Sequence, residues 1–136
     1  MLRIMNRLDS QIVSLRNKET TELDYVTRTN IERDLFLLTT AYAEQICGVK
    51  VDGIIYAHWS ELIEAYSYRI DPHDLSIIEL GKNTYILLRR LSSANPYEVA
   101  DTVYQHGGRA RAAETLANSI DNFISSIKHR VCSSKQ

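Results

Sequence analysis

Hydrophobic residues recur every three or four positions over most of the chain, which is the spacing of an amphipathic helix. In the first fifteen residues they fall within about 100° of arc when each residue advances by 100°. This segment is therefore predicted to be a helix with one narrow apolar stripe. The stripe consists of Met1, Ile4, Met5, Leu8, Ile12 and Leu15.

A second helix is predicted from Thr21 to about Cys47. Thr21, followed three residues later by Asp24, has the pattern of a weak capping box. Gly48 can take the left-handed conformation that ends a helix. The Leu-Phe-Leu-Leu run at 35–38 makes this helix apolar on several sides, so we expect it at the centre of the fold.

A third helix is predicted between Asp52, a candidate N-cap, and Pro72, which we expect to stop it. Its apolar stripe consists of Ile55, Trp59, Leu62, Ile63, Tyr66 and Ile70. The segment Asp74–Gly81 fits either a short helix or a short extended segment. A further helix is predicted over Thr84–Ser92.

The next element has the clearest start and stop signals in the chain. Asn95 is a candidate N-cap, Pro96 stands at the first helical position, and Glu98 completes a capping box. The helix is predicted to end at His106, because Gly107 can close it. A long final helix follows, with a stripe of Leu116, Ile120, Phe123, Ile124, Ile127 and Val131.

These elements predict an all-α protein, an antiparallel bundle of five or six helices, with a less regular orthogonal helical domain as the alternative. The chain has 136 residues with 5 Gly and 2 Pro, which favours one helical domain over residues 1–132 and a flexible tail at 133–136. Two stripes are expected to share one core, made of Trp59, Leu62, Tyr66, Leu116, Ile120, Phe123 and Ile127.

The motifs and segments that the sequence lacks limit the cellular location and the chemistry that we expect of the protein. Cys47 and Cys132 belong to no metal-binding spacing, and Arg3, Arg7 and Asp9 interrupt the apolar start, so we expect a cytoplasmic protein with reduced thiols. No apolar run approaches the roughly 20 residues of a membrane span. Neither a phosphate-binding glycine loop nor a GxSxG or HExxH motif occurs, and no cofactor or metal is expected.

Charge is divided unevenly along the chain. Residues 1–81 hold 8 Lys and Arg against 13 Asp and Glu, whereas residues 82–136 hold 8 against 4. The basic C-terminal part could bind a polyanion if its charges gather on one face. Alternatively, the two parts attract each other or a partner chain. A net charge of −1 gives no support to bulk, non-specific nucleic-acid binding.

His106 is the candidate for chemistry, because Gly107-Gly108 follow it and Arg109 and Arg111 come next. Arginine forks match phosphate oxygens, and a histidine can move a proton near neutral pH. His106, Arg109 and Arg111 could therefore hold an RNA phosphate and activate a 2′-hydroxyl in one exposed cleft. Alternatively, His106 satisfies helix-end carbonyls and the glycines only form a turn.

The other three histidines have simpler interpretations. His58 borders the third stripe and fits a hydrogen-bonded residue at the edge of the core. His73 follows Pro72 in a turn, and His129 lies near the end of the last helix, where a cation is favoured. Both are expected at the surface.

Two stretches resemble the HEPN superfamily, small helical domains of prokaryotic toxin–antitoxin and anti-phage systems. Residues 54–62 (IIYAHWSEL) are similar to the LLYAHWEGF helix of one HEPN-like nuclease branch. Residues 98–127 (EVADTVYQHGGRARAAETLANSIDNFISSI) look like the RNxxxHG segment followed by the closing helix. The resemblance covers about residues 30–130.

The resemblance implies a dimeric bundle with a metal-independent endoribonuclease site formed by an arginine and a histidine. The histidine corresponds to His106, but Asp101 stands where the arginine is expected and Thr102 takes the place of its polar partner. A carboxylate there repels a phosphate. Either Arg109 or Arg111 substitutes for the arginine, or the protein is a degenerate HEPN-like domain that binds RNA without cutting it.

The leading hypothesis is a HEPN-like protein of a prokaryotic or phage conflict system that binds or cleaves RNA. The alternative is a non-catalytic interaction module such as an antitoxin, adaptor or inhibitor subunit. The narrow stripe of residues 1–15, flanked by Arg and Asp, is typical of a helix that meets another helix. Together with the resemblance, it predicts a homodimer or a helical partner protein.

Overall fold

The computed structural model describes residues 1–17, 23–50 and 59–134, and every regular element in these ranges is a helix. The predicted all-α class is therefore confirmed. The six helices are α1 (Leu2–Asn17), α2 (Tyr25–Gln45), α3 (Trp59–Tyr66), α4 (Pro72–Leu91), α5 (Pro96–Gln105) and α6 (Arg109–Ser134).

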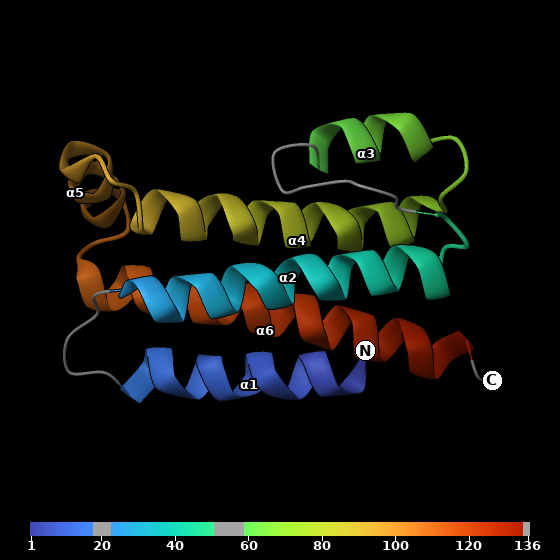
Figure 1. The fold of residues 1–136 in the computed structure, drawn as a ribbon, viewed down its shortest axis with the longest axis horizontal. Helices are drawn as coiled ribbons and strands as arrows, with labels where there is room; N and C mark the ends of the chain where they lie inside the picture. The colour runs from blue at the N-terminus through green and yellow to red at the C-terminus, as the bar shows by residue number, and fades with distance from the viewer. Residues whose placement is uncertain (18–22, 51–58, 135–136) are drawn as a thin grey trace.

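Four long helices form an antiparallel bundle (Figure 1). Helix α1 packs against α2 and α6, and α4 packs against the same two, so each helix of the bundle runs opposite to both neighbours. The short helix α3 lies on α4, in the connection from α2. Helix α5 lies across one end of the bundle and contacts α4 and α6. The regular antiparallel bundle, rather than the orthogonal alternative, is what the chain forms.

The apolar stripe of α1 is buried within the chain itself. Met5, Leu8, Ile12 and Leu15 are each at most 6% exposed and belong to the common core with residues of α2 and α6. The stripe therefore faces the protein's own bundle and is not left open for a second helix. This removes the stripe as an argument for a homodimer.

The core expected from the two stripes forms around α6. Leu116, Ile120, Phe123 and Ile127 have no exposed surface, and Trp59 is 2% exposed in the same cluster. Tyr66 lies at the edge of this cluster, partly buried, with its hydroxyl donating to the Lys50 carbonyl at 3.1 Å. The side chain of Leu62 lies outside the described residues, as do Thr21, Asp52, Ile55 and His58.

Pro72 begins α4, and it does not stop the third helix as predicted, because α3 has already ended at Tyr66. Asp71 is the N-cap of α4, its carboxylate accepts from the His73 amide at 2.9 Å, and Pro72 occupies the first helical position. Proline fits there because that position needs no amide donor. The two separate elements expected at Asp74–Gly81 and Thr84–Ser92 are therefore one continuous helix, which ends at Leu91.

The outer ends of two other helices also differ from expectation. Helix α2 begins at Tyr25 with Asp24 as its N-cap, and the Asp24 carboxylate accepts from the Thr27 amide at 2.7 Å. Gly48 has a φ of +67° in the turn that follows this helix, as predicted. Helix α6 continues to Ser134, two residues beyond the predicted end of the helical domain, and the rest of the predicted tail lies outside the described residues.

Gly81 lets α4 approach its two neighbours. A Cβ atom added at this position would lie 2.8 Å from Cζ of Phe123 on α6 and 3.1 Å from Oγ1 of Thr39 on α2. Real Cβ atoms do not approach an aromatic ring so closely, so a larger residue would force the helices apart. Glycine lowers helix propensity, and here its lack of a side chain allows the close approach of the helices.

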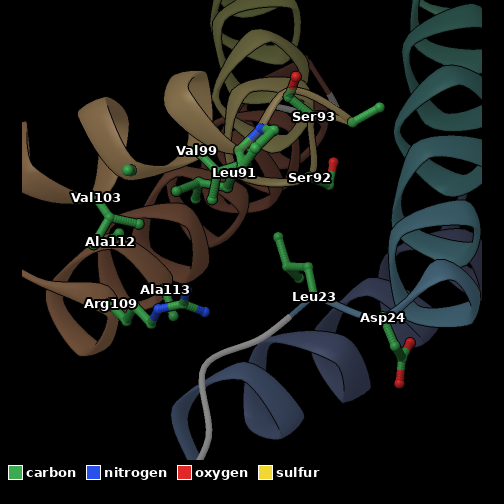
Figure 2. Close-up of a pocket in the computed structure, with 13 residues that line it drawn as sticks. Leu23, Asp24, Leu91, Ser92, Ser93, Val99, Val103, Arg109, Ala112 and Ala113 are labelled. Carbon is green, nitrogen blue, oxygen red and sulfur yellow. The ribbon is translucent and has the colours of Figure 1, made fainter.

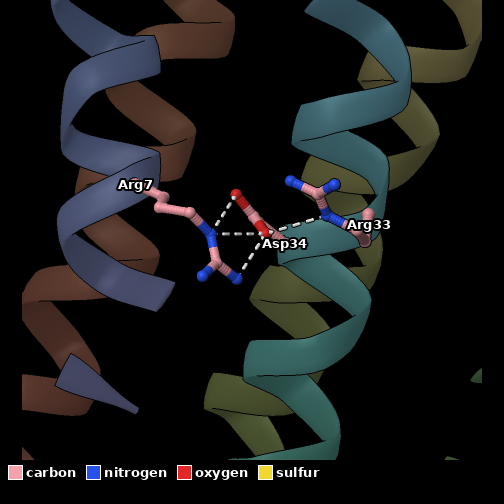
Figure 3. A network of polar contacts seen from close by, with 3 residues as sticks. All are labelled: Arg7, Arg33 and Asp34. Carbon is pink, nitrogen blue, oxygen red and sulfur yellow. Dashed lines mark hydrogen bonds and ion pairs between the residues drawn. The ribbon is translucent and has the colours of Figure 1, made fainter. Parts of the chain in front are cut away.

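Two buried aspartates tie the helices together by charge. Asp34 on α2 accepts from Arg7 on α1 at 2.9 Å and also pairs with Arg33 (Figure 3). Asp74 on α4 accepts from the Tyr42 hydroxyl at 2.5 Å and from Arg130 on α6 at 2.8 Å. A buried carboxylate needs such partners, and each pair favours one alignment of the helices.

Burial also controls the acidity of two groups beside Asp74. Burial, together with the hydrogen bond to Asp74, raises the pKa of Tyr42 well above its ordinary value. Burial raises the pKa of the nearby Cys47 thiol to about 11. A thiol with so high a pKa holds little thiolate at neutral pH, which makes Cys47 a poor nucleophile.

Removing the Phe123 ring should destabilise the bundle strongly. Phe123→Ala is expected to lower the free energy of unfolding by about 3–5 kcal/mol, because the ring is fully buried and contacts the Gly81 region. Urea denaturation monitored by circular dichroism measures the change. Val13→Ala, at a position 58% exposed, is the control and should change it by less than about 0.5 kcal/mol. Equal effects of the two substitutions would contradict the packing.

Candidate functional site

The surface is hollowed at the end of the bundle that α5 covers. Three adjoining hollows, of about 390, 530 and 480 Å³, lie among the start of α2, the end of α4, the whole of α5 and the start of α6. The first and second share Leu23, Ser92, Ser93 and Ala94, and the first and third share Ala100, Val103 and Arg109. We call these three hollows together the α5 groove.

The first hollow has aliphatic walls and a charged side (Figure 2). Its apolar lining includes Leu23, Leu91, Val99, Val103, Ala112 and Ala113. The guanidinium of Arg109 extends from α6 toward Leu23. The carboxylate of Asp24 turns away from the hollow and caps α2. Arg109 and Asp24 are the two charged residues that line this hollow.

Arginines line the groove from three helices. Arg28 (α2) and Arg89 (α4) line the second hollow, and Arg109 (α6) lines the first and third. Arg89 also pairs with Glu32 at 3.6 Å, with half of its side chain exposed. The lining carboxylate of Glu98 accepts from Ser93 at 3.0 Å. Arginine forks around a groove are suited to phosphate groups.

Three tyrosines stand exposed around the same end. Tyr25 on α2 is 72% exposed, and Tyr97 and Tyr104 on α5 are 84% and 85% exposed. Tyr97 and Tyr104 are seven residues apart, so they lie on one face of α5. Arg28 lies over the Tyr25 ring, with Cζ 5.4 Å from the centroid. Exposed rings beside arginines can stack on planar groups.

The ends of α5 fix its position as the sequence predicted, with one change at the start. Asn95 accepts from the Tyr97 amide at 3.0 Å. Glu98 does not reach back to Asn95, because Ser93 stands between them: the Asn95 amide donates to Ser93, which donates to Glu98. Ser93 was not recognised in the sequence, since a capping box was expected to need only two residues.

Glycines close α5 and open α6. The Gly107 and Gly108 amides donate to the carbonyls of Tyr104 and Val103 at 3.0 and 2.9 Å, which is a Schellman motif. Both glycines have positive φ, +83° and +118°. Gly108, directly before α6, has no side chain that could cap the helix. The first turn of α6 carries Arg109 and Arg111 and no acidic residue, although a helix start favours negative charge.

His106 occupies the C-cap of α5 and is partly exposed. Its Nδ1 lies 2.8 Å from the Thr102 carbonyl of its own helix, which requires that Nδ1 carries the proton. In the neutral ring, Nε2 then has a free lone pair and could accept a proton. His106 satisfies a helix-end carbonyl, as the simpler interpretation predicted, and it still keeps one basic nitrogen.

The three predicted site residues do not meet in one hollow. Arg109 lines two of the hollows, but neither His106 nor Arg111 lines any of the three. The Arg111 side chain instead lies over the turn, with Cδ 3.2 Å from where a Cβ of Gly107 would be. Residues two apart on a helix point in nearly opposite directions, which explains the separation. Asp101 is exposed on α5 and accepts from Gln105.

The remaining predictions concern two histidines, membrane-spanning helices and metal ligands. His73 and His129 lie at the surface. Within the described ranges, no helix is long and apolar enough to cross a membrane. Over the same part of the chain, no three His, Cys, Asp or Glu residues gather as metal ligands would.

Comparison with protein families, characterised proteins and solved structures finds no match for this chain. The function is therefore inferred from the α5 groove. Sequence reasoning found Arg109 there but missed Arg28, Arg89 and the tyrosines. The one signal for them was the pair Tyr97 and Tyr104, seven residues apart on one face of α5, of which Tyr104 lines the third hollow.

Proposed function

We propose that this protein binds a single strand of RNA in the α5 groove. The observation that carries the proposal is the meeting of arginines from three helices with three exposed tyrosines at one end of the bundle. Arginines neutralise backbone phosphates, and tyrosine rings stack on unpaired bases. The resemblance of residues 98–127 to HEPN domains supports the same class of ligand.

The groove favours a strand over a duplex. In a duplex the bases are already stacked on each other, so exposed tyrosines gain nothing from them. The groove also favours RNA over an acidic protein segment. Such a segment would be attracted by the arginines, but it offers no bases to Tyr97 and Tyr104. RNA, which would contact both arginines and tyrosines, can therefore be distinguished from an acidic segment, which would contact the arginines alone.

Loss of two groove arginines should weaken RNA binding in a salt-dependent way. Fluorescence anisotropy of a labelled oligouridine should give a slope of log K against log salt near −2, about −0.7 for each of three phosphates. Arg28→Ala with Arg109→Ala should reduce that slope to about −0.7. Arg3→Ala, an exposed arginine at the opposite end of the bundle, is the matched control and should leave the slope unchanged.

Two outcomes of this titration would contradict the proposal. One is equal weakening by Arg3→Ala and by the groove variant, which would indicate a diffuse charge effect. The other is displacement of the RNA by polyglutamate at the same charge concentration, together with no effect of Tyr104→Ala. The second outcome would favour an acidic protein partner, as expected of an antitoxin or adaptor.

RNA cleavage is the second candidate function, and the geometry of His106 favours it. With Nδ1–H donated to Thr102, Nε2 could take the proton of a ribose 2′-hydroxyl. The 2′-oxygen would then attack the adjacent phosphorus, and the bond to the 5′-oxygen would break. The products would be a cyclic phosphate and a 5′-hydroxyl that takes a proton from water. Asp101 argues against this reaction, because its carboxylate repels the phosphate.

Cleavage is tested by incubating end-labelled RNA with the protein in the presence of EDTA. If His106 is the base, His106→Ala should abolish cleavage and change RNA affinity less than twofold. Asp101→Asn should increase the cleavage rate, because it removes a negative charge near the phosphate. No cleavage by the unaltered protein would reject the enzyme and leave the binding function.

We also propose a cytoplasmic homodimer of a prokaryotic or phage conflict system, and this proposal rests on the HEPN resemblance. The stripe of α1 no longer contributes to it, because its residues are buried in the same chain. Analytical ultracentrifugation at micromolar concentration tests the association. A dimer is expected, and a monomer would remove dimer formation from the proposal.

A further inference from the structure

The first hollow of the α5 groove differs from a surface strip for phosphates in the apolar side chains that line it. Its volume of about 390 Å³ falls in the lower part of the range for small-molecule pockets, about 300–1,000 Å³. Aliphatic side chains line it, and a phosphate has no use for such walls. Aliphatic walls suit a flat, largely apolar group that loses its contact with water on binding.

We infer that this hollow takes one unstacked nucleobase of the bound strand, while Arg109 and the start of α6 hold the phosphate of the same nucleotide. The inference rests on the proposed RNA function and names the part of the ligand that enters the protein. The tyrosines outside the hollow would then contact the neighbouring bases of the strand.

Small residues make the space for the base. Ala112 and Ala113, 1% and 5% exposed, form the floor on α6, and Ala94 and Ala100 stand at the mouth. A larger side chain at any of these positions would fill the hollow. Leu23 and Leu91 provide aliphatic surface on the other side. Such walls can hold a base by contact with its faces.

Polar groups at the edge of the hollow fit the rest of the nucleotide. Ser92 lines the hollow and donates its hydroxyl proton to the Leu88 carbonyl at 2.6 Å, so its oxygen can accept from a base edge. The backbone ladder of α6 begins with the Ala112 amide, which donates to the Gly108 carbonyl at 2.9 Å. The start of this helix and the Arg109 guanidinium, which lines the hollow, both attract a phosphate.

The test compares two ligands that differ only by the base. Adenosine 5′-monophosphate and ribose 5-phosphate are titrated by isothermal calorimetry into the unaltered protein. The nucleotide should bind about tenfold more tightly, as expected for one held base. Ala100→Phe, at an exposed position that lines the hollow, should reduce nucleotide affinity about tenfold and leave ribose 5-phosphate unchanged.

Ala65→Phe is the matched control, since Ala65 is an exposed alanine of α3 far from the groove, and it should bind both ligands as the unaltered protein does. An oligouridine should displace the nucleotide, because both need the same hollow. Equal affinity for the two ligands would overturn the inference. Simultaneous binding of oligouridine and nucleotide would also overturn it, because the hollow would then hold a free nucleotide and not a base of the strand.

The oligouridine titration separates this inference from the proposed function. If the strand binds through Arg28 and Arg109 but the nucleotide and ribose 5-phosphate bind equally, the groove binds RNA and the base pocket is wrong. If the nucleotide shows its tenfold preference and the strand does not bind, the hollow is a nucleotide pocket without an RNA function, and the inference as stated fails with that function.

Discussion

The close packing of α4 against α6 at Gly81 and Phe123 determines how the rest of the chain is arranged. Because position 81 has no side chain, the Phe123 ring can lie against the backbone of α4, and both helices also reach α2. The end of α4 and the start of α6 are then close enough for the short helix α5 to bridge them. The α5 groove exists because of this bridge.

Apolar packing alone allows helices to slide or rotate, and the buried aspartates restrict that freedom. Asp34 joins α1 to α2, and Asp74 joins α2, α4 and α6. Each carboxylate has partners that match its charge, and no described buried side-chain nitrogen or oxygen lacks a hydrogen bond. A shift of one helix by a turn would leave a carboxylate buried without its arginine, which is strongly unfavourable. The bundle therefore holds α5 in a defined place.

The sequence predicted the helices well where periodicity and caps agree, and less well where one signal had two meanings. Asn95, Pro96 and Gly107 each have one structural use, and α5 lies where they indicate. A proline can either end a helix or start one, and Pro72 starts α4 after the Asp71 cap, whereas α3 has already ended at Tyr66. At the site, Arg109 could be found beside its glycines. Arg28, Arg89 and Tyr25 could not, because they reach the groove only when helices far apart in sequence pack together.

Cross-linking tests most directly whether RNA binds in the α5 groove. An oligonucleotide that contains 4-thiouridine is irradiated with the protein, and the attached peptides are identified by mass spectrometry. If RNA binds there, cross-links are expected at Tyr104 on α5 or at Tyr25 at the start of α2, since these exposed rings line the groove. Cross-links confined to Tyr68, which is 97% exposed beyond the end of α3, would contradict it.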